Sequence, residues 1–416
     1  MVQNVPNKLL CRCNRCNKAS RETCDGKERC KMALKIEKEF FGVVMSPRRE
    51  DVYDNGGGVL YPRVIELHHA GEKNGMLLAT FDYYTIKEPP VAPIYCSTDH
   101  GKTWEPYSQV EDTKNGYGIR FQPVLFELPV QCGDLPAGTI VFAGNSIPLD
   151  FKSTELLFYI SRDQGKTWEY RSSVAAGGPP IEQNFDELGP VWEPFIYLNA
   201  ANEITVVFTD ERPHTDRSLN QTLAVTSSKD GGKTWENEHL VVAIPDGMSR
   251  PGMAIVTKLP NGKYFMCYEI VCFPEEGDPY FDVHCRMSDD GMDFGDPAFK
   301  GTRIETADGF YLMSMPYCLW VPQGGENGTI IVSAKRDGDA LRLRDPGDFL
   351  VNYHLGEGPW ERVPMLVNYD SSIGQAGWSM GMCTIENGTK LLQLAPTQMD
   401  TRMLQISYGI GVLKSE

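Results

Sequence analysis

Short apolar runs, each long enough for one strand, alternate with polar turns over most of the chain. A polar turn directly precedes an apolar run at six places: Asn74-Gly75, Ala137-Gly138, Asn202-Glu203, Asn261-Gly262, Asn327-Gly328 and Asn387-Gly388. Successive turns lie 63, 65, 59, 66 and 60 residues apart. Each turn predicts a hairpin between two strands. The regular spacing indicates that one structural unit occurs six times.

A second repeat, independent of the first, has the pattern S-x-D-x-G-x-T-W. Intact copies begin at Ser97, Ser161 and Ser228, and a degenerate copy begins at Ser288. The Asp and Ser side chains of such a turn bind backbone amides, and the Gly adopts the positive φ that closes it. The motif resembles the Asp boxes of sialidases and related propeller proteins, where these turns are structural and lie away from the active site.

The two repeats together predict an all-β fold, a six-bladed β-propeller with Asp-box turns. A four-stranded unit that cannot bury its own faces must stack on its neighbours, and radial stacking gives a propeller. A proline stands near the start of the first strand in five units: Pro62, Pro123, Pro194, Pro251 and Pro316. The last unit lacks a fourth strand. We expect residues 40–45 to supply it by pairing with residues 404–413, which would close the ring with the two terminal strands.

Composition narrows the class of protein. The chain has 416 residues with 40 Gly and 28 Pro, which suits short strands and argues against long helices. It contains no run of eighteen apolar residues, so we expect no membrane span. A net charge of -16 argues against a nucleic-acid partner. We expect a monomer that needs no cofactor and no metal.

The N-terminal segment differs from the rest of the chain. Residues 1–37 are expected to form a disordered, cysteine-rich arm ahead of a propeller that spans residues 38–416. The spacing of Cys11, Cys13 and Cys16 suits a metal, but no matching Cys or His pair follows at zinc-finger distance. An extension upstream of a start near Met32 is a further interpretation. Residues 1–10 are polar and lack the apolar core of a secretory signal.

Strand direction assigns the ends of each unit to one of two faces. Counted from the axis, the first strand runs to the hairpin turn and the third runs to the Asp box, so both turns share one face. The starts of first strands and the ends of second strands therefore meet on the other face, near the axis. Residues at or beside these positions form the candidate site: Arg63, Asp82, Gln122, Asn145, Glu193, Asp210, Glu211, Arg212, Arg250, Glu269, Tyr317, Lys335, Arg336, Tyr369 and Trp378. The alternative is a ring of ion pairs that plugs the channel.

Two glutamates stand out in this ring. Glu193 is flanked by Trp192 and Pro194, and Glu269 ends an apolar strand one unit later. Apolar neighbours favour the protonated carboxyl, which suits a general acid. Two carboxyls from adjacent inner strands can flank one glycosidic bond. For either glutamate alone, a structural ion pair is the competing interpretation.

The segments around these glutamates carry a narrower resemblance. Trp192-Glu193-Pro194, Thr209-Asp210-Glu211-Arg212, Ser249-Arg250-Pro251-Gly252-Met253 and Tyr268-Glu269 resemble the exo-α-1,5-L-arabinanases of glycoside hydrolase family 93. The resemblance runs from about Tyr61 to the end of the chain and leaves out the cysteine-rich segment.

The resemblance implies a secreted, retaining enzyme that releases arabinobiose from the non-reducing end of arabinan. Its two catalytic glutamates match Glu193 and Glu269, and the apolar neighbours of Glu193 favour it as the acid/base. Tyr369 is expected to assist catalysis. The residues expected to bind the sugar are Arg63, Asp82, Asn145, Asp210, Arg250, Tyr317 and Arg336.

Two alternatives remain at this point. A sialidase would use an arginine triad, and Arg63, Asp82, Arg336 and Tyr369 could fill four of its positions. The fourth unit departs from that pattern, because Arg250 comes early in it and Glu269 late. A propeller that binds glycans without cleaving them is the other alternative, and the paired glutamates argue against it.

Overall fold

The computed structural model describes residues 33–53, 57–180, 187–274, 279–335, 347–370, 374–400 and 403–416. The cysteine-rich segment and Arg336, both named above, lie outside the described residues. The first strand, β1 (Leu34–Met45), begins four residues before the expected propeller boundary at residue 38.

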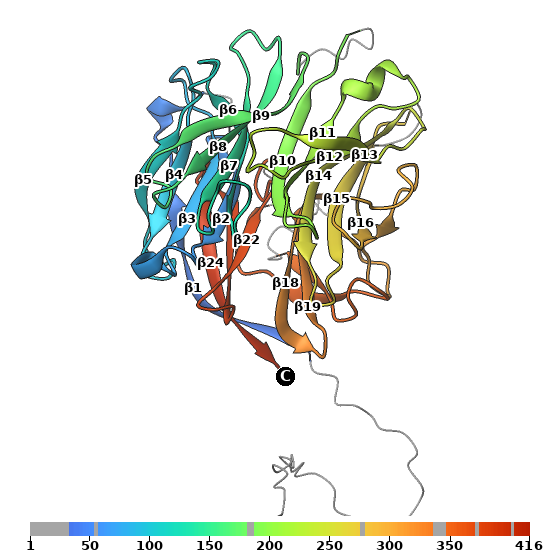
Figure 1. Cartoon of the computed structure of the whole chain (residues 1–416). Helices are drawn as coiled ribbons and strands as arrows, with labels where there is room; N and C mark the ends of the chain where they lie inside the picture. Colours follow the sequence, from blue (N-terminus) through green and yellow to red (C-terminus); the bar gives the residue numbers. More distant parts are fainter. Residues whose placement is uncertain are drawn as a thin grey trace, which may run out of the picture. The chain divides into compact units, whose positions relative to one another are not determined.

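The described residues form six antiparallel sheets of four strands each, confirming the predicted propeller (Figure 1). Blade 1 contains β2 (Val59–Glu66), β3 (Leu77–Tyr83), β4 (Ala92–Ser97) and β5 (Glu105–Val110). Blade 2 contains β6 (Ile119–Glu127), β7 (Ile140–Ser146), β8 (Thr154–Ser161) and β9 (Glu169–Gly177). Blade 3 contains β10 (Val191–Leu198), β11 (Ile204–Asp210), β12 (Thr222–Ser228) and β13 (Glu236–Val242).

The other three blades complete the ring. Blade 4 contains β14 (Ser249–Lys258), β15 (Tyr264–Cys272), β16 (Tyr280–Ser288) and β17 (Thr302–Arg303). Blade 5 contains β18 (Ser314–Gly325), β19 (Gly328–Lys335), β20 (Asp348–Asn352) and β21 (Glu361–Pro364). Blade 6 contains β22 (Gly381–Ile385), β23 (Lys390–Gln398), β24 (Leu404–Ser415) and β1. The first strands of neighbouring blades contact one another around the axis.

Helical structure in the described residues is limited to three 3-10 turns, η1 (Arg49–Asp51), η2 (Gly71–Lys73) and η3 (Arg212–Thr215). No helix there is long and apolar enough to cross a membrane. The core lies between the blades, where fully buried residues such as Phe158, Phe208 and Phe265 pack against the next sheet. Stacking of neighbouring sheets therefore supplies the burial that a single blade cannot.

The Asp boxes are structural turns, as their sequence pattern predicted. In the second box, Asp163 Oδ1 accepts hydrogen bonds from the backbone N–H groups of Lys166 (3.1 Å) and Thr167 (2.9 Å), and Asp163 Oδ2 accepts one from the Thr167 hydroxyl (2.7 Å). Gly165 adopts φ = 80° and its N–H donates to Ser161 Oγ. The degenerate copy at Ser288 makes the same Ser–Asp and Ser–Gly bonds.

Blade 5 has a counterpart of the Asp box that its sequence does not reveal. Asn352 Oδ1 accepts hydrogen bonds from the N–H groups of His354 and Gly356, both at 2.8 Å. Leu355 and Gly356 are both left-handed, as are the corresponding residues of the three intact Asp boxes. An Asn at the strand end therefore substitutes for the Ser and Asp of the motif.

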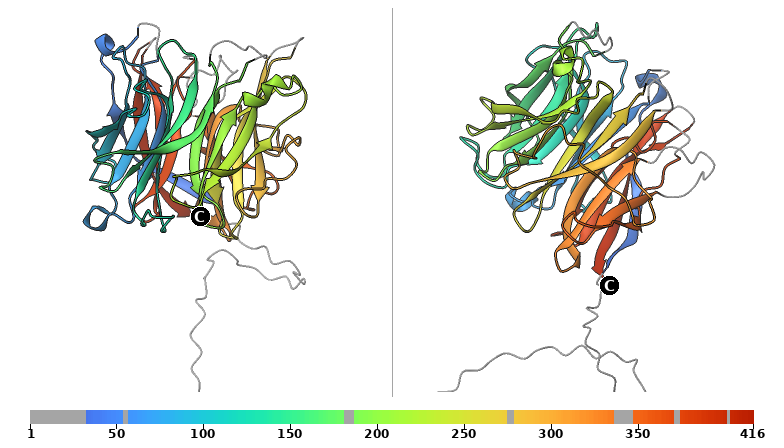
Figure 2. Two further views of the ribbon diagram at one scale, coloured as in Figure 1. Left: turned by 45° about the horizontal axis from the view of Figure 1, so that its top comes forward. Right: turned by 90° about the vertical axis from the view of Figure 1, so that its right-hand side faces the viewer.

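The N-terminal strand closes the ring, as predicted. β1 pairs antiparallel with β24 from Leu34↔Ser415 to Met45↔Ile406, with two register shifts. The blue and red strands lie side by side in Figure 2. Phe40 of β1 stacks on Tyr408 of β24 with ring centroids 6.2 Å apart. The fourth strand of blade 6 thus comes from the opposite end of the described chain.

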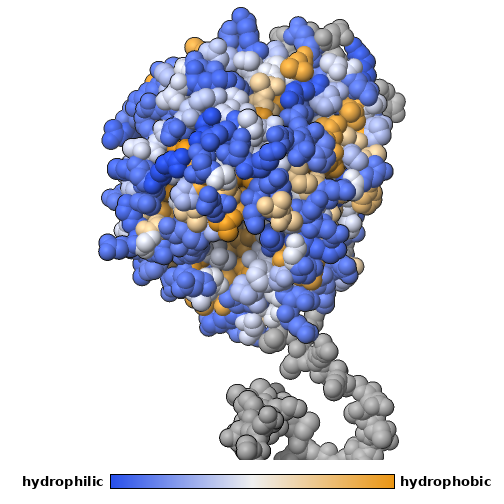
Figure 3. Space-filling model, viewed as in Figure 1, coloured by the Kyte–Doolittle hydropathy of each residue, from blue (hydrophilic) through white to orange (hydrophobic). Residues whose placement is uncertain are grey.

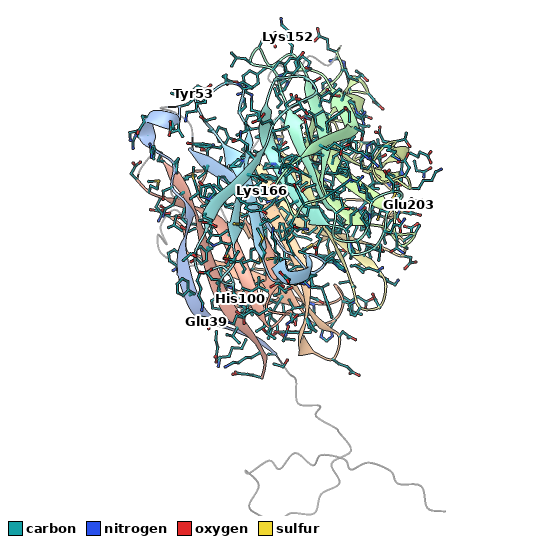
Figure 4. All side chains as sticks on the ribbon, turned by 60° about the vertical axis from the view of Figure 1, so that its left-hand side comes forward. Glu39, Tyr53, His100, Lys152, Lys166 and Glu203 are labelled. Carbon is teal, nitrogen blue, oxygen red and sulfur yellow. The ribbon has the colours of Figure 1, made fainter. Side chains whose placement is uncertain are left out.

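Figure 4 labels residues from both faces of the propeller. His100, in the first Asp box, lies at the lower end of that view together with Glu39 of β1. Tyr53 and Lys152, in loops next to the first and second strands of their blades, lie at the upper end. We call the latter face, where first strands begin and second strands end, the upper face.

Candidate functional site

Every blade carries an irregular residue at the start of its first strand, on the upper face. These non-glycine residues all have φ between 50° and 58°: Tyr61, Gln122, Glu193, Met253, Met315 and Ser379. In blades 1 to 5 the pairing of the first and second strands shifts around this residue. The residue is therefore a β-bulge, which redirects a side chain next to the axis. We call these six positions the bulge residues.

Proline follows the bulge residue directly in blades 1, 2, 3 and 5. In blade 4, Pro251 precedes the bulge residue Met253 by two positions. Pro251 therefore stands near the start of its strand, as expected, but at a different position relative to the bulge from the other four prolines. Arg250 consequently lies three residues before its bulge, whereas Glu193 is itself a bulge residue.

Side chains link the bulge residues from one blade to the next. Asp82 Oδ1 accepts a hydrogen bond from the N–H of Gln122 at 2.6 Å, and Gln122 Oε1 accepts one from the N–H of Glu193 at 3.0 Å. Glu193 Oε2 in turn accepts a bond from the N–H of Met253 at 2.8 Å. Glu269 Oε2 accepts one from the N–H of Met315 at 2.7 Å. These bonds bring Asp82, Glu193 and Glu269 together around the axis.

Glu193 has a second donor and a close glycine neighbour. The Thr209 hydroxyl donates to Glu193 Oε2 at 2.7 Å. A Cβ atom at Gly252 would lie 2.8 Å from Gln221 Nε2 and 3.3 Å from Glu193 Oε2, so this position tolerates only glycine without a shift of its neighbours. Glu193 remains partly exposed, whereas Glu269 is only 8% exposed.

The buried carboxyls influence one another. Burial raises the pKa of Glu269 to about 8, with a further increase from the charge of Glu193, opposed by the Met315 N–H and Arg250. Burial also raises the pKa of Glu193, opposed mainly by the Thr209 hydroxyl and the Met253 N–H. The pKa of Asp82 is raised well above its usual range by burial, and the charge of Glu193 contributes. The site can therefore hold one ionised and one protonated carboxyl near neutral pH.

Arg250 is fixed beside these carboxyls by acceptors from blade 3. It donates to Glu211 Oε1 (2.9 Å) and Oε2 (3.2 Å), and also to the side-chain oxygens of Asn220 and Gln221. Trp192 Nε1 donates to the same Glu211 carboxylate at 3.0 Å. Arg250 thus contributes a fixed positive charge, and Glu211 holds it in place.

Aromatic and apolar side chains surround the bulge residues. Tyr61, Met253 and Met315 form a buried cluster with residues of blade 6, and Tyr369 and Trp378 pack against it while partly exposed. A Cβ atom at Gly377 would lie 2.5 Å from the Tyr369 ring, so the two residues are in close contact. Tyr369 and Trp378 therefore belong to the site. An apolar surface next to polar groups is typical of a carbohydrate site.

Arg63 and Tyr317 lie deeper along the axis, two residues beyond their bulges. Arg63 is 2% exposed and donates to the Ser379 carbonyl (3.1 Å) and hydroxyl (2.9 Å). Its guanidinium lies 3.9 Å from the Tyr61 ring centroid and 5.3 Å from that of Tyr317. Tyr317 lines a cavity of about 480 Å³ below the bulges. Figure 3 shows hydrophobic side chains around a hollow near the middle of the surface. These two residues support the floor of the site.

Three other residues of the candidate ring are engaged within the fold. Asn145 is fully buried, and its amide joins blades 2 and 3 by donating to the Val191 carbonyl at 2.8 Å. Both oxygens of Asp210 accept bonds from Arg212. Lys335 is buried and donates to the Gly374 carbonyl. The polar atoms of Asn145 and Asp210 thus serve inter-blade and ion-pair contacts, and the expected sugar-binding role of these two residues stays a prediction.

No group of three metal-ligating side chains is present in the part of the chain that the structure describes. Two groups with raised pKa values in adjacent blades suit general acid and nucleophilic roles at one bond.

Comparison with known proteins places this site in a family context. The BNR/Asp-box repeat model matches residues 95–106 and 159–170. A 110-residue stretch is 32% identical to mouse (Mus musculus) sialidase-2, but this match spans 25% of the chain and 28% of that protein.

Two solved propellers match over nearly their whole length. An α-L-arabinanase of Penicillium chrysogenum, determined with arabinobiose, is 34% identical, with a TM-score of 0.77, and the match covers 90% of this chain and 98% of that one. The GH93 α-L-arabinofuranosidase of Fusarium graminearum, also with arabinobiose, is 30% identical, with a TM-score of 0.77 and coverage of 90% and 97%. The chain therefore belongs to glycoside hydrolase family 93, within the sialidase-like Asp-box propellers.

Proposed function

We propose that the protein cleaves α-1,5-linked L-arabinan from the non-reducing end, with retention of configuration. The observation that carries this proposal is the pair of carboxyls, the partly exposed Glu193 and the buried Glu269, at the inner ends of adjacent blades. Its two relatives indicate the substrate class, since both were determined with arabinobiose. Retention requires one carboxyl to attack the anomeric carbon and the other to protonate the leaving oxygen.

The hydrogen bonds favour Glu193 as the nucleophile and Glu269 as the acid/base. Glu193 receives two hydrogen bonds on one oxygen, from Thr209 and Met253, and both stabilise its ionised form. Glu269 receives one from Met315, and its pKa rises to about 8. The first proton of the pair is thus lost from Glu193, which leaves Glu269 protonated. This reverses the assignment expected from the apolar neighbours of Glu193 in the sequence.

In this mechanism Glu193 attacks the anomeric carbon while Glu269 donates its proton to the departing sugar oxygen. Glu269 then takes a proton from the water that releases the covalent intermediate. Arg250 helps to keep Glu193 ionised, and Tyr369 and Trp378 offer apolar ring surface to the sugar. Asp82 fixes the Gln122 bulge that holds the backbone of Glu193.

The sialidase alternative loses support from the position of Arg63. An arginine that binds a substrate carboxylate must present its guanidinium to the open site, whereas Arg63 is buried and bonded to Ser379. The match to sialidase-2 spans only 110 residues, and we attribute it to similar propeller blades in the two proteins.

The substrate is tested by incubating the protein separately with linear arabinan and with a sialoside. We expect arabinobiose to accumulate from arabinan from the earliest time points, and proton NMR should show the retained anomer first. A ladder of longer products would contradict the exo mode, and sialic acid release without arabinan cleavage would contradict the substrate.

The two catalytic roles are tested by azide rescue of alanine variants. Glu269→Ala, lacking the acid/base, should give a glycosyl azide of retained configuration from a substrate with a good leaving group. Glu193→Ala, lacking the nucleophile, should give the inverted azide. The opposite pair of products would restore the assignment of Glu193 as the acid/base.

A further inference from the structure

The rim of the upper face carries an unusual share of exposed apolar side chains. Among the described residues, most large exposed apolar side chains lie in its loops or at adjoining strand ends: Tyr53, Ile86, Tyr117, Leu149, Leu188, Phe273, Tyr280 and Met399. Exposed apolar groups gathered on one face of a protein mark a binding surface. At this rim, blade 4 brings two aromatic rings into contact with each other, Phe273 and Phe281.

These two rings lie on the same side of blade 4 as Glu269. Side chains of a strand alternate between its two faces, so Glu269 and Val271 of β15 share a face, and Phe273 continues it just beyond the strand. Phe281 of β16 pairs with Val271, which places Phe281 on that face as well. The Phe273 and Phe281 rings meet edge to face, with centroids 6.5 Å apart. Phe273 is 55% exposed, so much of its ring is available to a ligand.

The distance from Glu269 to the Phe273 and Phe281 rings suits a polymeric substrate, which can extend from one to the other. Four residues of extended strand lead from Glu269 to Phe273, a distance of about 13 Å. An enzyme that acts from the chain end holds that end at its carboxyls, so the rest of the polymer must leave across the rim. A flat apolar ring binds the C–H face of a neutral sugar without needing charges, which matches a neutral arabinan chain.

We propose that Phe273 and Phe281 form an aromatic platform that binds the sugar residues beyond the cleaved bond. This inference rests on the proposed action on arabinan and adds the binding site for the departing part of the polymer. The platform raises the productive affinity for long chains. It has no contact with a short substrate whose leaving group ends near Glu269.

The test compares kcat/KM on long linear arabinan with kcat/KM on an aryl arabinobioside. We expect Phe273→Ala to lower the value for arabinan by about three- to tenfold, in the range of one aromatic contact, and to leave the aryl substrate unchanged. Phe273→Tyr should retain the wild-type values. Tyr280→Ala is the matched control, because Tyr280 is 42% exposed and adjacent to Phe281 but points to the opposite face of the blade.

Each outcome bears on one of the two proposals. An unchanged value for arabinan in Phe273→Ala, an equal loss on both substrates, or an equal loss in Tyr280→Ala would overturn the platform while leaving arabinan cleavage intact. Wild-type protein that does not cleave arabinan would instead contradict the proposed function, and the platform with it.

Discussion

The two proposed catalytic carboxyls, of Glu193 and Glu269, each accept a hydrogen bond from a backbone N–H group of the next blade. Both donors are N–H groups of bulge residues, and Arg250 is the nearby fixed cation. Burial raises the pKa values of both glutamates, and the one or two neutral donors that each has do not offset it. Asp230, in an exposed Asp box with four neutral donors, has a lowered pKa instead. The bulges thus create a site that can exchange protons.

The pH dependence of the rate should follow from this arrangement. Glu269 must be protonated to act as the acid, and its pKa is about 8. We expect kcat/KM on arabinan to fall about tenfold per pH unit above that value. Asp82→Asn is the control, because Asp82 is the other carboxyl of the site with a strongly raised pKa. If the alkaline limb of the profile shifts in Asp82→Asn, the limb reports Asp82, and its assignment to Glu269 is wrong.

Stability should also report the pKa of Glu269. Its folded pKa of about 8 exceeds the ordinary value of 4.5, so between these values the folded protein binds a proton that the unfolded chain lacks. The stabilising contribution is complete below pH 4.5 and is lost as pH rises through about 8.

Glu269→Gln keeps an acceptor for the Met315 N–H but cannot ionise. We expect its free energy of unfolding to exceed that of the wild type by at least about 1 kcal/mol at pH 8, with little difference at pH 4. Urea denaturation at both pH values measures this difference. Parallel pH profiles of the two proteins would show that Glu269 does not titrate as described.

At the scale of single residues, the sequence predicted the site only in part. Glu193, Glu269 and Arg250 were placed near one another by strand order alone. The bonds that orient them, from Thr209, Gln122 and the bulge N–H groups, were not predicted, because a left-handed non-glycine residue has no distinct sequence signature. The depth of Arg63 was not predicted for the same reason: the bulge at Tyr61 shifts the register of the first strand, so counting along that strand does not give depth along the axis.

At the scale of the elements, the Asp boxes show what a local pattern can determine. Each box is closed by hydrogen bonds within a few residues, so its sequence is sufficient to predict its structure. The Asn352 turn of blade 5 reaches a similar structure with a different residue, which a search for Ser and Asp cannot find. The number of blades was nevertheless predictable, because the hairpin turns recur in all six.

The second Asp box should contribute stability without contributing to turnover. Asp163 accepts bonds from Ser161, Lys166 and Thr167 on the face opposite the carboxyls. We expect Asp163→Ala to lower the free energy of unfolding by about 2 kcal/mol, as for the loss of a capping side chain. Turnover per folded molecule on arabinan should remain at the wild-type value. A loss of turnover at unchanged stability would contradict the structural role.

At the scale of the whole molecule, ring closure explains why one blade is built from both ends of the chain. A propeller whose last blade used only consecutive strands would leave β24 with an open edge. β1 covers that edge along most of its length and places Phe40 on Tyr408. Unfolding either end therefore opens the ring, which couples the first and last blades.

Two truncations should separate this closure from the segment before it. Deleting residues 1–31 leaves every described strand in place, so we expect the melting temperature to stay within about 2 °C of the full chain and activity to be retained. Deleting residues 1–45 removes β1 and exposes the backbone of β24. We expect that protein to melt at least about 10 °C lower and to associate through the open edge. Scanning calorimetry and size-exclusion chromatography measure the two effects. Equal stability of the two truncated proteins would mean that the β1–β24 pairing does not hold the ring together, and that the packing between blades is sufficient.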